Sequence, residues 1–144
     1  METSTMKMKI EKVKTSRIHE VDFDNLAFGT VFTDHMLTCK YKNGAWEQPE
    51  IVPYQPISLD PSAKIFHYGQ SIFEGMKGYK DVNDDIWLFR PMDNCKRLNI
   101  SAKRMAIPEL PETYFMDGLK ELLRLDKDWI PKKQGSSLYI RPFI

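Results

Sequence analysis

The sequence lacks the features that mark several classes of protein. Its charge is balanced, with 21 Lys and Arg against 20 Asp and Glu and a formal net charge of +1, whereas nucleic acid and anionic membrane surfaces favour a clear basic excess. No apolar run approaches the roughly 20 residues that cross a bilayer. The basic start METSTMKMKIEKVK is not followed by the apolar segment of a secretory signal. We therefore expect no nucleic-acid partner, no membrane partner and a cytoplasmic location.

Cysteine and histidine are too few and too scattered to predict a metal or disulfide framework. The two cysteines, Cys39 and Cys95, lie far apart without CxxC spacing. The three histidines, His19, His35 and His67, show no metal-ligand spacing, and none lies in a recognisable nucleophile motif. We expect no metal site, and we interpret the histidines as structural.

The sequence does contain enough apolar material for one folded domain. Hydrophobic residues make up 42% of its 144 positions and aromatic residues 12%, as in a globular protein. Residues 1–26 are mostly polar and charged and are predicted to form a tail or a loosely attached arm. The folded unit is then expected to occupy residues 27–144.

Several segments predict strands and turns. The β-branched and aromatic residues of 29–41 favour a strand, followed by a KNG turn. The stretch 45–63 carries four prolines, and because proline cannot donate to a sheet ladder, it is predicted to be an edge strand or an extended connection. The polar turn 81–85 and the apolar segment 86–91 predict a hairpin, and 137–143 predicts a closing strand.

Two helices are expected between these strands. Asp93 can cap a helix over 94–106, and a second helix is predicted to begin near Pro111 or Glu112. Each carries apolar side chains along one face: Cys95, Leu98, Ala102 and Met105 in the first, and Phe115, Leu119, Leu122 and Leu123 in the second. Strands followed by helices predict an α+β fold, a two-layer sandwich in which helices cover one face of an antiparallel sheet.

The segment HYGQSIFEGMKGYK (67–80) combines three aromatic rings with three glycines. Gly69, Gly75 and Gly78 permit turns and close backbone approach, while Tyr68 and Phe73 add flat apolar surface. The combination is typical of an aromatic-lined pocket for an apolar side chain, and equally of a tightly packed sheet corner. Periodicity does not separate the two interpretations.

Arg97 is a candidate anion ligand. It lies about one turn into the helix expected after Asp93, next to Lys96, with no acid between them and the cap. Positive charge at the positive end of a helix is mildly unfavourable, whereas an anion bound there would be favoured by both the helix and the arginine. The alternative is a pair of solvated basic side chains.

The closing segment SLYIRPFI (137–144) offers a second candidate. In a strand, Tyr139, Arg141 and Phe143 point to the same face. A hydroxyl donor beside a guanidinium suits a carboxylate ligand. The alternative is an arginine paired with an acidic neighbour at a sheet edge.

Four segments together carry a family resemblance: FGTVFTDHML, HYGQSIFEGMKGYK, LFRPMDNCKRLNISAKRM and SLYIRPF. They resemble the N-terminal part of branched-chain amino acid aminotransferases, which are pyridoxal 5'-phosphate enzymes of fold type IV. The resemblance runs from near Glu20 to Ile144. It implies that residues 27–144 form the small N-terminal domain of such an enzyme, with the C-terminal cofactor domain absent.

The resemblance implies a role for three polar residues. Arg97 matches the arginine that binds the cofactor phosphate. Tyr139 matches a residue that orients the substrate carboxylate, and Arg141 one that meets the second carboxylate of glutamate when glutamate is the amino donor.

The resemblance also implies an apolar side-chain pocket. Phe73 and Gly75 match its wall, and Phe28 is a further pocket residue by the same comparison. Tyr68 matches a tyrosine that reaches into the site of the neighbouring subunit, which implies a homodimer.

The implied reaction is amino transfer between leucine, isoleucine or valine and 2-oxoglutarate by a ping-pong mechanism on pyridoxal 5'-phosphate, within branched-chain amino acid biosynthesis. The lysine that forms the Schiff base lies beyond Ile144 in this family, so no catalytic residue is expected in this chain. Residues 1–144 alone are expected to be inactive.

Two alternatives remain open at this point. One is a relative of the same fold type, a D-amino acid aminotransferase or an aminodeoxychorismate lyase, although FTDHML and LYIRPF speak against it. The other is a non-enzymatic module that dimerises with or regulates a partner, supported by the missing lysine.

Overall fold

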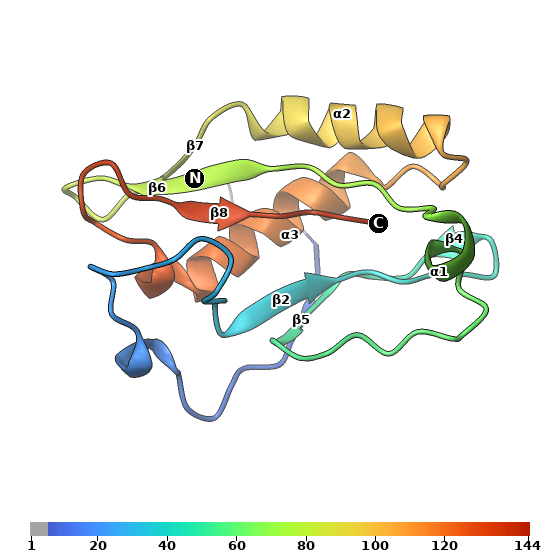
Figure 1. The fold of residues 1–144 in the computed structure, drawn as a ribbon. Helices are drawn as coiled ribbons and strands as arrows, with labels where there is room; N and C mark the ends of the chain where they lie inside the picture. Colours follow the sequence, from blue (N-terminus) through green and yellow to red (C-terminus); the bar gives the residue numbers. More distant parts are fainter. Residues whose placement is uncertain (1–5) are drawn as a thin grey trace.

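The computed structural model describes residues 6–144 and confirms the α+β class (Figure 1). Within this range the strands form two three-stranded sheets and a separate hairpin. The helices α2 (Pro91–Arg104) and α3 (Glu112–Leu125) are the longest elements. No helix of the described residues is both long and apolar enough to cross a membrane.

The first sheet has the order β1-β5-β2, with β1 at Lys9–Ile10, β5 at Glu50–Pro53 and β2 at His35–Thr38. The strand β2 is antiparallel to β5, and β1 is parallel to it. The prediction of an edge strand in 45–63 is therefore wrong for β5, which is the central strand. Its prolines are tolerated because Pro53 is the last residue of the strand and Pro49 precedes it.

In the sequence, a short hairpin of β3 (Tyr41–Lys42) and β4 (Ala45–Trp46) separates β2 from β5. Its turn residues Asn43 and Gly44 have φ values of 51° and 80°. Positive φ at both positions is typical of the tight hairpin turn for which Asn-Gly is favoured. The KNG turn predicted from the sequence is confirmed.

The second sheet has the order β7-β6-β8 and is antiparallel throughout, with β6 at Met76–Lys80, β7 at Ile86–Leu88 and β8 at Leu138–Ile140. The predicted hairpin and closing strand are both present. Pairing between the two segments continues beyond β6 and β8, because the N–H of Glu74 donates to the carbonyl of Pro142 at 2.9 Å.

Three other short elements complete the fold: a one-turn helix η1 (Ile18–Glu20), a short helix α1 (Lys64–Tyr68) and η2 (Lys127–Trp129). The sequence did not predict α1. Its end is set by Gly69, whose φ of 60° stops the helix in the left-handed conformation.

The helix α2 begins earlier than predicted. Arg90 is the N-cap, in the left-handed conformation with φ of 48°, and Pro91 is the first helical residue. Asp93 is therefore not the cap: it lies in the first turn and forms an ion pair with Arg90 at 2.5 Å. Proline favours the first helical position because it has no N–H to leave unpaired, and this outweighed the capping preference of Asp93.

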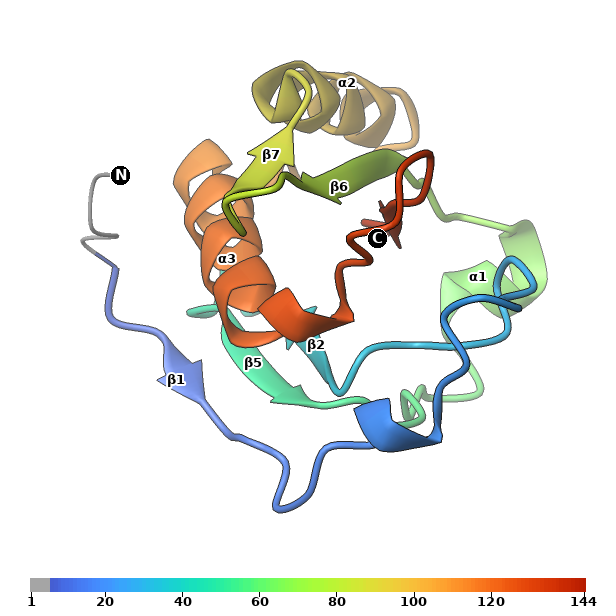
Figure 2. The same cartoon turned by 90° about the vertical axis from the view of Figure 1, so that its left-hand side faces the viewer.

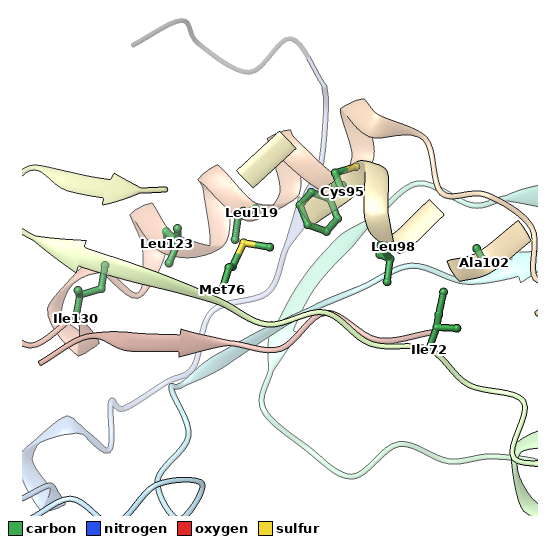
Figure 3. Close-up of a cluster of buried hydrophobic side chains, with 9 residues drawn as sticks. Ile72, Met76, Cys95, Leu98, Ala102, Leu119, Leu123 and Ile130 are labelled. Carbon is green, nitrogen blue, oxygen red and sulfur yellow. The ribbon is translucent and has the colours of Figure 1, made fainter. Parts of the chain in front are cut away.

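One apolar core joins α2, α3 and β6 (Figure 3). Ile72 and Met76 come from β6 and the segment before it, Cys95, Leu98 and Ala102 from α2, and Phe115, Leu119 and Leu123 from α3. The predicted apolar faces are confirmed except for Met105, which follows α2 and is 37% exposed, and Leu122, which is half-buried and lies outside this core. Figure 2 shows α3 close to both sheets.

Gly118 allows α3 to approach the first sheet closely. A Cβ at this position would lie 2.6 Å from Cδ2 of Leu37 in β2. The first sheet is thus packed against α3, which also packs against β6.

A buried histidine connects this first sheet to the end of α3. The ring Nδ1–H of His35 donates to Asp126 at 2.6 Å, and the backbone N–H of His35 donates to the same carboxylate at 3.0 Å. The other ring nitrogen, Nε2, accepts the backbone N–H of Val13 at 3.0 Å. These partners fix the neutral ring with its proton on Nδ1, and they tie the segment around Val13 to the core.

Asp34, next to His35 in the sequence, also ties the N-terminal segment to the core. Its buried carboxylate accepts the indole N–H of Trp129 and the backbone N–H of Arg17, each at 3.0 Å. Burial raises the pKa of this carboxyl, but the hydrogen bonds from Arg17, Ser16 and Trp129 outweigh it and hold the pKa below its usual value. Residues 13–17 are therefore fixed by backbone N–H donors to two buried side chains.

The substitution Asp126→Ala is expected to lower the free energy of unfolding by roughly 2–4 kcal/mol, because it leaves two buried N–H donors of His35 unpaired. Urea denaturation of the 144-residue chain measures this change. Asp128→Ala removes an exposed carboxylate two residues away and serves as the control. Equal losses in the two variants would contradict the role assigned to Asp126.

Candidate functional site

A buried carboxylate holds an exposed arginine on the surface formed by α2 and the segment before β6. Nε of Arg97 donates to Oε1 of Glu74 at 2.5 Å, and Nη2 donates to Oε2 at 2.7 Å. Glu74 is 5% exposed, whereas the side chain of Arg97 is 66% exposed. This is a bidentate charge-assisted pair, the strongest geometry available to an arginine and a carboxylate.

Asn94 completes this arrangement from α2. Its Nδ2 donates to Oε2 of Glu74 at 3.0 Å and to the carbonyl of Gly75 at 3.3 Å. The hydrogen bond from Arg97 is the main reason why the pKa of Glu74 lies below its usual value, and it outweighs the opposing effect of burial. The same contact raises the pKa of Arg97. Both groups are therefore charged.

Arg97 lies further from the N-terminus of α2 than the sequence predicts. Since α2 begins at Pro91, Arg97 lies in the second turn, and Asp93 supplies an acidic residue in the first. The field of the helix terminus decays within its first turn and therefore has little effect at Arg97. The alternative of a solvated side chain holds only in part for Arg97, because its side chain is 66% exposed but Glu74 binds two of its N–H groups.

A second polar group lies on β8 and the residues after it. Nε and Nη2 of Arg141 donate to Oη of Tyr139 at 3.1 and 2.8 Å. The guanidinium carbon of Arg141 lies 4.4 Å from the centroid of the Phe73 ring, within the range of a cation–π contact. In the part of the chain that the structure describes, Arg141 makes no ion pair with an acidic side chain, so the edge-pair interpretation is wrong.

The phenol of Tyr139 lies directly over Gly75. A Cβ at Gly75 would lie 2.5 Å from Oη of Tyr139, so a glycine is needed for this approach. Phe28 packs edge-on against Tyr139, with ring centroids 5.1 Å apart. We call Phe28, Phe73, Gly75, Tyr139 and Arg141 the aromatic cluster.

Two shallow hollows lie beside these groups, and Asn94 borders both. One has a volume of about 300 Å³ and is lined by Gly75, Tyr139 and residues of β6. The other has a volume of about 240 Å³ and is lined by Arg97, Arg90 and Asp93. The exposed guanidinium of Arg97 is thus available to an anion. It lies next to an aromatic surface that carries a second cation, Arg141.

Six of the seven predicted site residues therefore lie in two adjacent groups, Arg97 in one and the five members of the aromatic cluster in the other. Tyr68 lies apart from them at the end of α1, where it is 81% exposed and its ring contacts only His67 among the described aromatic rings. Among the described residues, no group of His, Cys, Asp and Glu side chains is placed to hold a metal ion.

Neither Glu74 nor Asn94 is predicted from the sequence as a site residue. In the structure, Ile72, Glu74, Met76 and Gly78 are all buried and alternate with exposed or half-buried residues. A carboxylate on the buried face of an apolar strand needs a partner. That partner is Arg97, which is distant in sequence and is brought near only by the packing of α2 on β6.

The chain is similar in sequence to known branched-chain-amino-acid aminotransferases. The chain is 46% identical over its whole length to branched-chain-amino-acid aminotransferase 2 of Bacillus subtilis (strain 168), of which it covers 39%. It is 48% identical over 141 residues to branched-chain-amino-acid transaminase 1 of the same organism, of which it covers 40%. No protein-family model matches the chain.

Solved structures show the same fold. The branched-chain amino acid aminotransferase of Escherichia coli superposes with a TM-score of 0.53 over 76% of this chain and 31% of its own, at 24% identity. A second branched-chain amino acid aminotransferase, solved with pyridoxamine 5'-phosphate, gives a TM-score of 0.50 over 65% of this chain and 28% of its own, at 30% identity.

The chain therefore has the fold of the fold type IV aminotransferases. Within that class it is a homologue of the branched-chain-amino-acid aminotransferases, and it spans about two fifths of the length of the curated relatives that it matches.

Acid is expected to weaken the contact between Glu74 and Arg97. A carboxyl whose pKa is lower in the folded chain stabilises the fold above its unfolded pKa, and this stabilisation is lost as the pH falls. Glu74→Gln is expected to lower the free energy of unfolding by about 1–3 kcal/mol at neutral pH. The difference from the wild type should shrink as the pH falls below about 4.5, the ordinary pKa of this carboxyl.

Urea denaturation of both chains at a series of pH values measures this difference. Glu109→Gln, which changes an exposed carboxylate, is the matched control. A difference between wild type and Glu74→Gln that stays constant into acid would contradict the charged pair.

Proposed function

We propose that this chain supplies the phosphate contact and the substrate-binding surface of a branched-chain-amino-acid aminotransferase. The reaction is amino transfer between leucine, isoleucine or valine and 2-oxoglutarate by a ping-pong mechanism, within branched-chain amino acid biosynthesis. The observation that carries the proposal is an exposed arginine, fixed by a buried carboxylate, beside an aromatic cluster with a second cation. The names of the relatives support the choice of substrate.

The cofactor of this proposal is pyridoxal 5'-phosphate, and the residues present fit its phosphate. Arg97 has five N–H donors, of which Glu74 occupies two. The three others belong to a largely exposed side chain that borders a hollow. When bound, the cofactor supplies an electron sink for chemistry at the substrate Cα.

Arg141 and Tyr139 are proposed to recognise carboxylates. Tyr139 would orient the carboxylate next to the substrate Cα, and Arg141 would meet the second carboxylate of glutamate. The contacts of Arg141 support this role, because the Tyr139 hydroxyl and the Phe73 ring leave its charge unneutralised. A γ-carboxylate that entered an apolar pocket without such a partner would cost several kcal/mol.

The side chain of leucine, isoleucine or valine would lie against Phe73, Gly75 and Phe28. Apolar rings exclude water from a branched aliphatic group without offering it a hydrogen bond. The exposed position of Tyr68 is compatible with a contact to the site of a second subunit, and a homodimer is therefore part of the proposal.

None of the seven predicted site residues is a lysine. We propose that the lysine that binds the cofactor is supplied from beyond Ile144, that residues 27–144 act as the small domain, and that the protein is cytoplasmic. The names of the relatives give no support to a D-amino acid aminotransferase or an aminodeoxychorismate lyase, nor to a regulatory module.

In the full-length enzyme, Arg97→Ala is expected to weaken cofactor binding by at least about tenfold, since a charge-assisted contact to the phosphate is lost. Dialysis followed by absorbance measurement of the retained cofactor tests this. Arg104→Ala, at the exposed end of the same helix, is the control. Unchanged retention in Arg97→Ala would mean that another group binds the phosphate.

Arg141→Ala is expected to impair the reaction with glutamate by about tenfold or more and the reaction with leucine much less, since only glutamate carries a γ-carboxylate. The ratio of kcat/KM for the two amino donors measures this selectivity. An equal loss for both donors would rule out recognition of the second carboxylate by Arg141.

A further inference from the structure

Glu74 differs from the other buried polar side chains of residues 6–144. His35 and Asp126 pair with each other, and Asp34 accepts the backbone N–H of Arg17 and the indole N–H of Trp129, with the Arg17 side chain only loosely paired at 3.7 Å. Glu74 instead binds both Nε and Nη2 of an arginine whose side chain is 66% exposed, at 2.5 and 2.7 Å. Burying the carboxylate of Glu74 costs desolvation free energy, and the contact that results fixes a surface cation.

A contribution to the stability of the fold does not by itself explain why Glu74 and Arg97 are paired. Replacing a buried ion pair with apolar groups of similar volume is often neutral or stabilising. The surroundings of Glu74 would allow it, because its neighbours on the buried face are Ile72 and Met76. What an apolar residue at position 74 could not do is hold the guanidinium of Arg97.

The geometry of the pair fixes the guanidinium in one orientation. Two parallel hydrogen bonds, from Nε and Nη2, define both the position and the plane of the group. Both N–H groups of Nη1 and one of Nη2 are left over. Asn94 in turn prevents Glu74 from rotating, because its Nδ2 binds both Oε2 of Glu74 and the carbonyl of Gly75.

We propose that Glu74 is a positioning residue that holds Arg97 so that its Nη1 edge meets the phosphate of the cofactor. The inference rests on the phosphate role of Arg97 in the proposed function and deepens it. Orientation and charge act in opposite directions here, because the carboxylate that aligns the guanidinium also repels an anion. We expect orientation to have the larger effect on phosphate binding.

The test compares pyridoxal 5'-phosphate with pyridoxal, which lacks the phosphate. The ratio of their dissociation constants for the full-length enzyme, measured by absorbance titration, isolates the phosphate contact from the rest of the cofactor site. Glu74→Gln is expected to reduce the preference for the phosphorylated form by about tenfold. Glu74→Asp keeps the charge but shortens the side chain by one methylene group, and is expected to reduce the preference by a smaller factor.

Two outcomes would overturn the proposal. A preference that rises in Glu74→Gln would mean that the negative charge of Glu74 opposes phosphate binding. Losses that are equal for both ligands, with an unchanged preference, would mean a purely structural role. If Glu74→Gln does not fold, Glu74→Asp decides on the same criterion.

Two further variants separate this proposal from the proposed function. Glu50→Gln removes a carboxylate that pairs with Lys9 at 3.4 Å in the other sheet, and it should leave the preference unchanged. If Arg97→Ala also leaves the preference unchanged, the phosphate role of Arg97 is wrong, and the role of Glu74 is wrong with it. If Arg97→Ala reduces the preference and neither Glu74 variant does, only the positioning role fails.

Discussion

The packing of α2 and α3 against β6 is the constraint on which the rest of the structure depends. Cys95, Leu98 and Ala102 face the core from α2, and this fixes the rotation of the helix about its axis. Asn94 and Arg97 precede two of these residues and are thereby directed at the edge of the core, next to the segment that enters β6. Glu74 lies on the buried face of that segment and completes the contact.

The two arginines of the candidate site are held by different chemistry. Arg97 pairs with a full negative charge, whereas Arg141 rests on a neutral hydroxyl and an aromatic ring. A guanidinium fixed by a carboxylate is well oriented but partly neutralised, while one held by neutral groups keeps its charge.

Much of the fold could be predicted from local pattern, and the errors share one cause. The hairpin turn at Asn43 and Gly44, the start of α3 and the closing strand all follow from nearby residues. The central place of β5 and the start of α2 do not. The first depends on pairing with β1 from the N-terminal arm, and the second on a left-handed Arg90 that ends the preceding strand segment. Turn chemistry and periodicity are local, whereas strand neighbours and the exact end of a helix depend on the rest of the chain.

The candidate site likewise has features that follow from the sequence and features that depend on the tertiary structure. The sequence alone determined the fold class, the apolar faces of both helices, the pairing of Tyr139 with Arg141 on one strand face and the family resemblance, because each depends on residue order over a short span. Only the tertiary structure decided that Glu74 is the partner of Arg97 and that Gly75 accommodates the phenol of Tyr139. These contacts join residues 23 and 64 positions apart. No local pattern specifies them, because they form only after the core has brought α2 and β8 to the two sides of one segment.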